Sequence, residues 1–223
     1  MKIAERDELL RIKQAMLEMG EKAVVAVKLS ISALVTNNTL TAAKVRDIEK
    51  EVDAYYQSID EQCISALSKQ PDEESLRFLV GSLKIAIEIE RSCDYANQIA
   101  KRVQKEFSQQ DMTALRSQVQ SITHMVQEAV TMLENALVAY EHGDDDAADR
   151  LHAQDDLVDK KTHDLFRSLL CVASLNPWIQ EVVLDLHVVV RYVERVADRS
   201  ANVAELVYYI VRGTRFCKTN KTL

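Results

Sequence analysis

Two short segments of the sequence carry carboxylates at a spacing that could bind a cation. Glu90 and Asp94 lie four positions apart in one segment, and Glu194 and Asp198 lie four positions apart in the other. On a helix, this spacing brings both side chains of a pair onto one face. A rotation of about 100° per residue puts Glu90 and Asp94 on the same stripe as the apolar Ile87, so we expect the pair to point toward a core. Carboxylates in such a place need a cation, a proton or a hydrogen-bonding partner.

Two further pairs with the same spacing precede the two prolines of the chain. They are Glu49 and Asp53 before Pro71, and Asp155 and Asp159 before Pro177. If the helices on either side of each proline form an antiparallel hairpin, the four carboxylates of a hairpin lie at one level, roughly 30 Å from the turn at 1.5 Å per residue. We therefore predict two clusters of four carboxylates, one in each hairpin.

Clustered carboxylates repel one another and raise one another's pKa. A hard divalent or trivalent cation removes this repulsion, and ligands that are all oxygen favour iron, manganese, magnesium or calcium over zinc or copper. The alternative is a set of salt bridges in which Arg91 and Arg195, adjacent to the acids, neutralise them. His187, seven residues before Glu194, is either a further ligand or a hydrogen-bonded core histidine. The residues alone leave these alternatives open.

Long helices must position these pairs, since the chain contains only 4 Gly and 2 Pro and its apolar residues recur with helical period. The periodicity predicts helices over residues 5–36, 41–69, 71–107, 111–141, 144–173 and 177–212. Pro71 is expected at the first position of the third helix. The second half repeats the first with an offset of 104 to 106 residues, which indicates internal duplication. We predict an all-α fold of two tandem three-helix bundles, residues 1–108 and 109–223.

Composition narrows the class of protein. The net charge of −7 argues against nucleic acid as a partner, because phosphate binding needs a basic surface. No apolar run approaches the roughly 18–20 residues of a membrane span, so we expect no insertion into a membrane. The cysteines form no Cys-x-x-Cys pair, and the charged N-terminal segment lacks a signal-peptide core; both features favour a cytoplasmic protein. We find no nucleophile with a base and no phosphate-binding loop, so we expect no enzymatic activity.

At its acidic motifs the chain resembles the PhoU family of bacterial phosphate-signalling regulators. The third and sixth helices of that family carry Glu-Arg-x-Gly-Asp followed by His-Ala-x-Asn-Ile. The matching residues are Glu90, Arg91, Asp94, Ala96 and Ile99 in the first repeat and Glu194, Arg195, Asp198, Asn202 and Val203 in the second; Pro71, Leu76 and Arg77 match the Pro-x-x-x-Asp-Leu-Arg opening. The departures are Cys93 and Ala197 for glycine, Tyr95 and Arg199 for histidine, Gln98 for asparagine, and Ser75 for aspartate.

The resemblance implies a function. It implies a regulator of phosphate uptake and phosphate-starvation signalling, acting as an adaptor between the ATPase of a phosphate ABC transporter and a membrane sensor histidine kinase. It also implies metal binding by Glu49, Asp53, Glu90, Asp94, Asp155, Asp159, Glu194 and Asp198. We expect a homodimer. The competing hypotheses are a metal-dependent enzyme or metal-storage protein that uses the same carboxylates, and a helical interaction module without metal.

Overall fold

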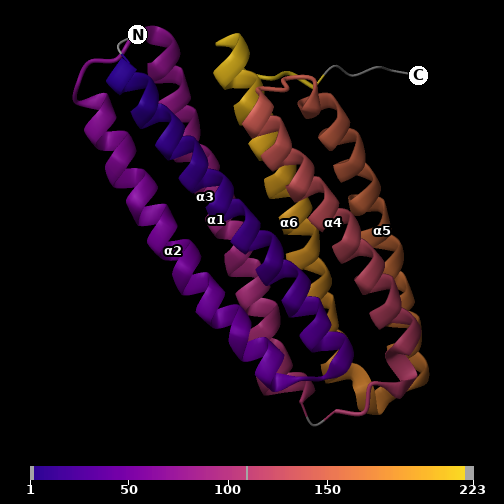
Figure 1. Ribbon diagram of the computed structural model, residues 1–223. Helices are drawn as coiled ribbons and strands as arrows, with labels where there is room; N and C mark the ends of the chain where they lie inside the picture. The colour runs from indigo at the N-terminus through magenta and orange to yellow at the C-terminus, as the bar shows by residue number, and fades with distance from the viewer. Residues whose placement is uncertain (1–2, 109, 219–223) are drawn as a thin grey trace.

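Six long helices run along one common axis in the computed structural model, which describes residues 3–108 and 110–218 (Figure 1). They are α1 (Ile3–Thr36), α2 (Thr39–Leu67), α3 (Glu73–Arg102), α4 (Arg116–His142), α5 (Ala147–Leu175) and α6 (Gln180–Arg212). A π-helical turn, η1 (Val103–Phe107), extends α3, and the 3-10 turns η2 (Thr113–Leu115) and η3 (Pro177–Ile179) precede α4 and α6. The predicted all-α fold with three helices in each half is confirmed. None of the described helices combines the length and apolar character that a membrane span requires.

The two proline turns differ from each other. Pro177 opens η3, as expected of a proline at the start of a helix. Pro71 does not open α3, which corrects the prediction, because α3 begins at Glu73 with Asp72 as its N-cap. The Asp72 side chain accepts a hydrogen bond from the backbone N–H of Ser75 at 2.9 Å. An aspartate satisfies an unpaired N–H of the first turn, which a proline side chain cannot do, so the helix begins after Asp72.

The two halves pack against each other in an antiparallel arrangement. Helices α1, α2 and α3 contact one another, α4 and α5 contact α6 and each other, and the halves meet where α3 packs on α6 and α1 on α4. Along α3 and α6, Gly81 faces Ile210, and Tyr95 stacks on Tyr192 with ring centroids 5.7 Å apart. Residue numbers thus rise along α3 while they fall along α6. We call this contact the α3–α6 seam.

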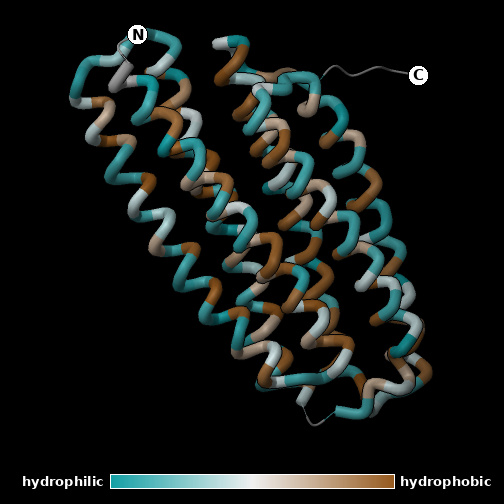
Figure 2. The backbone as a smooth tube through the Cα atoms, in the orientation of Figure 1, coloured by the Kyte–Doolittle hydropathy of each residue, from teal (hydrophilic) through white to brown (hydrophobic). Residues whose placement is uncertain are grey.

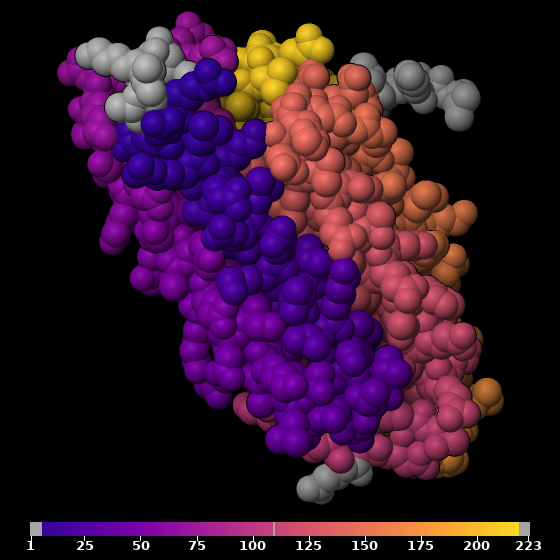
Figure 3. Space-filling view, viewed as in Figure 1, coloured from indigo at the N-terminus to yellow at the C-terminus, as the bar shows by residue number. Residues whose placement is uncertain are grey.

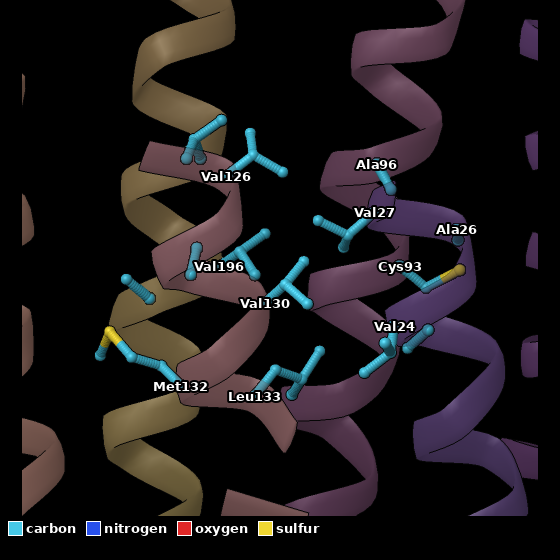
Figure 4. Close-up of a cluster of buried hydrophobic side chains, with 14 of the residues drawn as sticks. Val24, Ala26, Val27, Cys93, Ala96, Val126, Val130, Met132, Leu133 and Val196 are labelled. Carbon is cyan, nitrogen blue, oxygen red and sulfur yellow. The ribbon is translucent and has the colours of Figure 1, made fainter. Parts of the chain in front are cut away.

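One hydrophobic core runs through both halves. Brown apolar positions recur along the helices of both halves in Figure 2, and the buried apolar residues of both halves form one connected cluster. In its centre, Val24 and Val27 of α1 face Val130 and Leu133 of α4 (Figure 4). On the visible surface, the two halves lie side by side along their length (Figure 3). The duplicated units therefore form a single packed body, which fixes the acidic motifs of one half relative to those of the other.

Candidate functional site

The first repeat brings its four predicted carboxylates together. Glu49 and Asp53 of α2 and Glu90 and Asp94 of α3 are half-buried along the contact between these two helices; we call them the first acidic face. The buried Asn97 of α3 donates a hydrogen bond from Nδ2 to Glu49 Oε1 at 2.6 Å. Burial raises the pKa of Asp53, and the charges of Glu49 and Asp94 raise it further. The antiparallel hairpin therefore places these residues at one level, as the proline spacing predicts.

The charge of the first acidic face is poorly compensated. Burial raises the pKa of Glu90 to about 7, and the carboxylates of Asp94 and Asp53 add to the shift. Arg91 opposes it, but its Nε lies 3.6 Å from Glu90 Oε2 and 58% of its side chain is exposed, so solvent screens its charge. Burial also raises the pKa of the Cys93 thiol, which keeps this side chain neutral. The face is a concentration of negative charge that a proton or a cation would relieve.

The second repeat builds an equivalent cluster. Asp155 and Asp159 of α5 and Glu194 and Asp198 of α6 form what we call the second acidic face. Burial raises the pKa of Asp155 to about 6, and the charges of Asp159 and Asp198 contribute while His152 opposes. The buried Oδ1 of Asp155 has no hydrogen-bond partner. Asp159 is exposed at the rim of the cluster.

Arginines pair with the second acidic face. Glu194 forms an ion pair with Arg191, one turn earlier on α6. Asp198 accepts a hydrogen bond from Arg199 Nη2 at 2.8 Å. Arg199 also reaches across the α3–α6 seam, where Nη1 donates to Glu88 Oε2 at 3.0 Å. Neutralisation by arginine was one of the two alternatives left by the sequence. Here it involves Arg191 and Arg199, whereas the sequence suggested Arg91 and Arg195 for this role.

Three of the residues that shape the faces were missed by sequence reasoning. Arg191 precedes Glu194 by three positions, and Asn97 follows Asp94 by three, so helical spacing could have found both. The contact from Arg199 to the other repeat has no such local signal, because it depends on how the two halves pack. Sequence spacing therefore can identify the carboxylates and their neighbours on the same helix, but not the contact between the two repeats.

Two other predicted participants play smaller parts. The ring of His187 packs against Phe166 with centroids 4.4 Å apart, and its Nδ1 has no hydrogen-bond partner. Burial and the charge of Arg191 lower the pKa of His187. Its role as a metal ligand stays a prediction. Burial raises the pKa of Glu194, and the charge of Arg195 opposes this rise only slightly.

The carboxylates lie at the edge of the core and not at its centre, which corrects the expectation that they point inward. Ile87, on the same stripe as Glu90 and Asp94, is 42% exposed. The buried side of α3 is instead centred on residues such as Ile89 and Cys93, both 0% exposed. Helix α3 contacts α1, α2 and α6 at once, so its buried arc turns away from the acidic stripe. The acids are consequently accessible from solvent.

The donor set fits a hard cation in chemistry. Carboxylates come from two helices in each face, and buried side-chain oxygens of Asn97 and Asp155 have no hydrogen-bond partner. In their present rotamers, however, no three His, Cys, Asp or Glu side chains of the described residues converge closely enough to hold a metal ion. A cation would therefore have to draw the half-buried carboxylates toward it. The assignment of the eight ligands stays a prediction.

The two acidic faces lie at the same height on either side of the α3–α6 seam. Glu88 with Arg199 marks one crossing of the seam, and Tyr95 with Tyr192 marks another. With the offset of 104 residues, Glu88 corresponds to Tyr192 and Arg199 to Tyr95. The ion pair and the stacked pair thus occupy equivalent places in the duplicated structure, so the repeats have diverged where they meet.

Comparison with protein-family models and known proteins adds an independent finding. The model of the PhoU domain matches residues 16–103 and again residues 122–207. The "Phosphate-specific transport system accessory protein PhoU homolog" of Synechocystis sp. is 30% identical over 208 residues, which cover 93% of this chain and 91% of that protein. The "Phosphate-specific transport system accessory protein PhoU" of Escherichia coli is 29% identical over 94% of this chain and 86% of its own length.

A solved structure is similar over nearly the whole chain. The crystal structure of PhoU from Pseudomonas aeruginosa superposes with a TM-score of 0.87 at 28% sequence identity, and covers 94% of this chain and 99% of that one. The tandem arrangement of two three-helix units is therefore shared with that protein. The residues that match the PhoU domain model include α2, α3, α5 and most of α6, which are the helices that carry the acidic faces.

Proposed function

Because this chain belongs to the PhoU family, we propose that it is a cytoplasmic regulator of phosphate uptake and of phosphate-starvation signalling. The observation that carries the proposal is that both repeats match the family domain and both present an acidic face at the same level. The relatives from Synechocystis sp. and Escherichia coli are named as accessory proteins of phosphate-specific transport. That name describes a regulatory component, and we propose no enzymatic activity for this chain.

The proposed mode of action is that of an adaptor. The protein would contact the ATPase of a phosphate ABC transporter and a membrane sensor histidine kinase, and lower uptake when phosphate is plentiful. A body of six parallel and antiparallel helices offers long outer surfaces for such contacts (Figure 1). We propose that it acts as a homodimer, which would present two copies of each surface.

Metal binding is part of the proposal. Oxygen ligands favour iron, manganese, magnesium or calcium, and such a cation would add positive charge to the acidic faces. Glu49 and Asp53 hold their carboxylates on α2, while Glu90 and Asp94 hold theirs on α3. Ligands from two helices would tie those helices together, so metal occupancy would stiffen the hairpin. The unpartnered buried oxygens and the raised pKa of Glu90 support this role.

The regulatory proposal is tested by deleting the gene in its own organism. We expect a phosphate-starvation promoter fused to a reporter to rise several-fold in phosphate-rich medium, because the brake on signalling is lost. A plasmid copy of the gene should return the reporter to its low level. A reporter that stays low after deletion, in a strain where starvation still induces it, would contradict the proposed role in phosphate signalling.

A further inference from the structure

One side of α5 exposes a row of side chains to solvent. At about 100° per residue, six exposed residues of α5 share this side, and Trp178 of η3 follows them. We call them the α5 outer stripe: Leu157, Lys160, Asp164, Arg167, Cys171, Leu175 and Trp178. Leu157 is 59% exposed, and Leu175 and Trp178 are each 78% exposed. Helix α5 lies at an outer edge of the molecule, so another molecule can reach the stripe (Figure 1).

The equivalent side of α2 in the first repeat is polar. Single exposed apolar residues are common on protein surfaces, so the comparison between the repeats is the informative observation. With the offset of 106 residues, three apolar residues of the stripe have polar counterparts: Leu157 has Glu51, Leu175 has Lys69, and Trp178 has Asp72. Glu51 and Lys69 form ion pairs with α1, and Asp72 caps α3. The first repeat thus uses these positions within the chain, whereas the second repeat presents apolar groups to solvent.

A cavity of about 450 Å³ opens beside the stripe, between α4 and α5, and its lining includes Gln154 and Leu157. In the first repeat, Tyr55 bridges the equivalent helices, since its hydroxyl donates to Glu18 Oε2 at 2.9 Å. The residue equivalent to Tyr55 is Lys161, which lines the cavity and has no ring. Helices α4 and α5 also pack less closely than α1 and α2 do. The second repeat therefore has an open cavity where the first repeat has an aromatic side chain.

The middle of the stripe carries opposite charges. Asp164 and Arg167 are exposed, and neither forms an ion pair or a hydrogen bond with another residue in the part of the chain that the structure describes. Suppose that the α5 helices of two copies lie antiparallel, with a two-fold axis between residues 165 and 166. Asp164 of each copy then lies opposite the partner's Arg167, so both contacts form. The stripe is therefore complementary in charge to a second copy of itself.

The same register aligns the apolar ends of the stripe. Leu157 lies within one residue of the level of the partner's Leu175. Trp178 lies within one residue of the level of the partner's Gln154, which lines the cavity. One register thus pairs the charges, joins the leucines and brings an exposed indole to a cavity that lacks a ring.

We propose that two copies of this chain pair through the α5 outer stripe around a two-fold axis, with Trp178 of each copy in the cavity between α4 and α5 of the other. This inference rests on the homodimer proposed above and names its contact surface. Buried tryptophans contribute much of the binding energy of protein interfaces, so Trp178 carries the largest share here. Asp155 lies about 160° around α5 from Leu157, so the second acidic face stays open in this dimer.

The experiment is sedimentation equilibrium of the purified full-length protein. The variant Leu157→Glu plus Trp178→Asp introduces the residues of the first repeat, and should raise the dissociation constant of the dimer roughly 100-fold, because apolar contacts are lost on both sides of the axis. The matched control is Leu40→Glu plus Ile64→Glu, at exposed positions of α2 on the opposite edge of the molecule (Figure 1). It should dimerise as the wild type does. Circular dichroism confirms that each variant is folded.

A charge exchange tests the register of the contact. Asp164→Arg places like charges opposite each other twice, and should raise the dissociation constant roughly 10-fold. Asp164→Arg plus Arg167→Asp exchanges the charges and should recover the dissociation constant of the wild type. If the double exchange dimerises as poorly as Asp164→Arg alone, the proposed pairing is wrong.

The fluorescence of Trp178 gives a second readout, because the sequence contains 1 Trp. Its emission maximum should move to longer wavelength as dilution separates the dimer, since the indole leaves the cavity for water. An emission maximum that stays constant while the dimer dissociates would place Trp178 outside the contact and overturn the inference.

The outcomes separate this inference from the proposed function. If the Leu157→Glu plus Trp178→Asp variant dimerises as tightly as the wild type, the stripe is not the contact and the inference is wrong, while the homodimer stands. If the wild-type protein is a monomer at every concentration, both the inference and the homodimer part of the proposed function are wrong, whereas the reporter assay still decides the regulatory part.

Discussion

Replacing Arg199 by alanine is expected to lower the free energy of unfolding by about 2 kcal/mol. Arg199 Nη1 lies 3.0 Å from Glu88 Oε2, and the two side chains are only 24% and 17% exposed. Removal of one partner from a fully buried pair costs about 3–5 kcal/mol, and the partial exposure of this pair reduces the loss. Asn202 still donates to Glu88 at 3.2 Å, so the carboxylate keeps one partner.

The measurement is urea unfolding at neutral pH, with Arg195→Ala as the matched control. Arg195 is an exposed arginine one turn before Arg199 on the same helix, and its loss should change stability by no more than about 0.5 kcal/mol. A double-mutant cycle with Glu88→Gln isolates the contact across the α3–α6 seam. If Arg199→Ala is as stable as Arg195→Ala, the ion pair does not hold the two repeats together.

Glu90→Gln is expected to stabilise the metal-free protein at pH 8 by about 1–2 kcal/mol. The pKa of Glu90 rises from 4.5 to about 7 on folding, mainly through burial. Between these values the folded state binds more protons than the unfolded state, so stability falls as the pH rises from 4.5 to 7, and the cost is complete above pH 7. The full shift corresponds to about 3 kcal/mol, which solvent screening of a half-buried group reduces. Glutamine removes this cost.

The check is urea unfolding of both proteins at pH 5 and pH 8 in the presence of a chelator. The advantage of Glu90→Gln should be small at pH 5, where the native carboxyl is already protonated, and complete at pH 8. Glu61→Gln, at an exposed position of α2, is the control for the loss of one negative charge. No gain at pH 8 beyond that of the control would show that the first acidic face is not under electrostatic strain.

The positions of the carboxylates could be predicted from the sequence because they depend on local rules. The spacing of Glu90 and Asp94 fixes a helix face, and the distance of each acid from Pro71 or Pro177 fixes its level in a hairpin. These rules hold for α2 with α3 and for α5 with α6. Burial and the neighbouring carboxylates raise the pKa of Glu90 in the first hairpin and the pKa of Asp155 in the second. The helical fold follows from the same periodicity.

The features that were not predicted depend on packing between the repeats. Arg199 acts on Glu88, 111 positions away in sequence, and no periodicity connects them. The half-buried position of Glu90 reflects three helices that contact α3 at once, while the stripe pattern of one helix suggests a single buried side. Pro71 lies outside α3 because Asp72 is a better cap, a choice between neighbouring residues that composition does not decide.

The two repeats of the duplicated chain have diverged at positions that supply positive charge to the acidic faces. The equivalent positions 87 and 191 hold Ile87 and Arg191, and positions 95 and 199 hold Tyr95 and Arg199. Each change adds a cation to the second acidic face and none to the first. The carboxylates themselves remain in both repeats, so the two faces share a scaffold and differ in what compensates it.

The central claim is that the protein restrains phosphate-starvation signalling and that its two acidic faces are needed for this role. Its most direct test is complementation of the deletion strain in phosphate-rich medium with reporter activity as the readout. The account predicts that the wild-type gene restores a low signal, whereas Glu90→Gln plus Asp94→Asn and Glu194→Gln plus Asp198→Asn, each present at equal protein level, leave the signal high. Full restoration of the low signal by the Glu90→Gln plus Asp94→Asn variant would contradict the account.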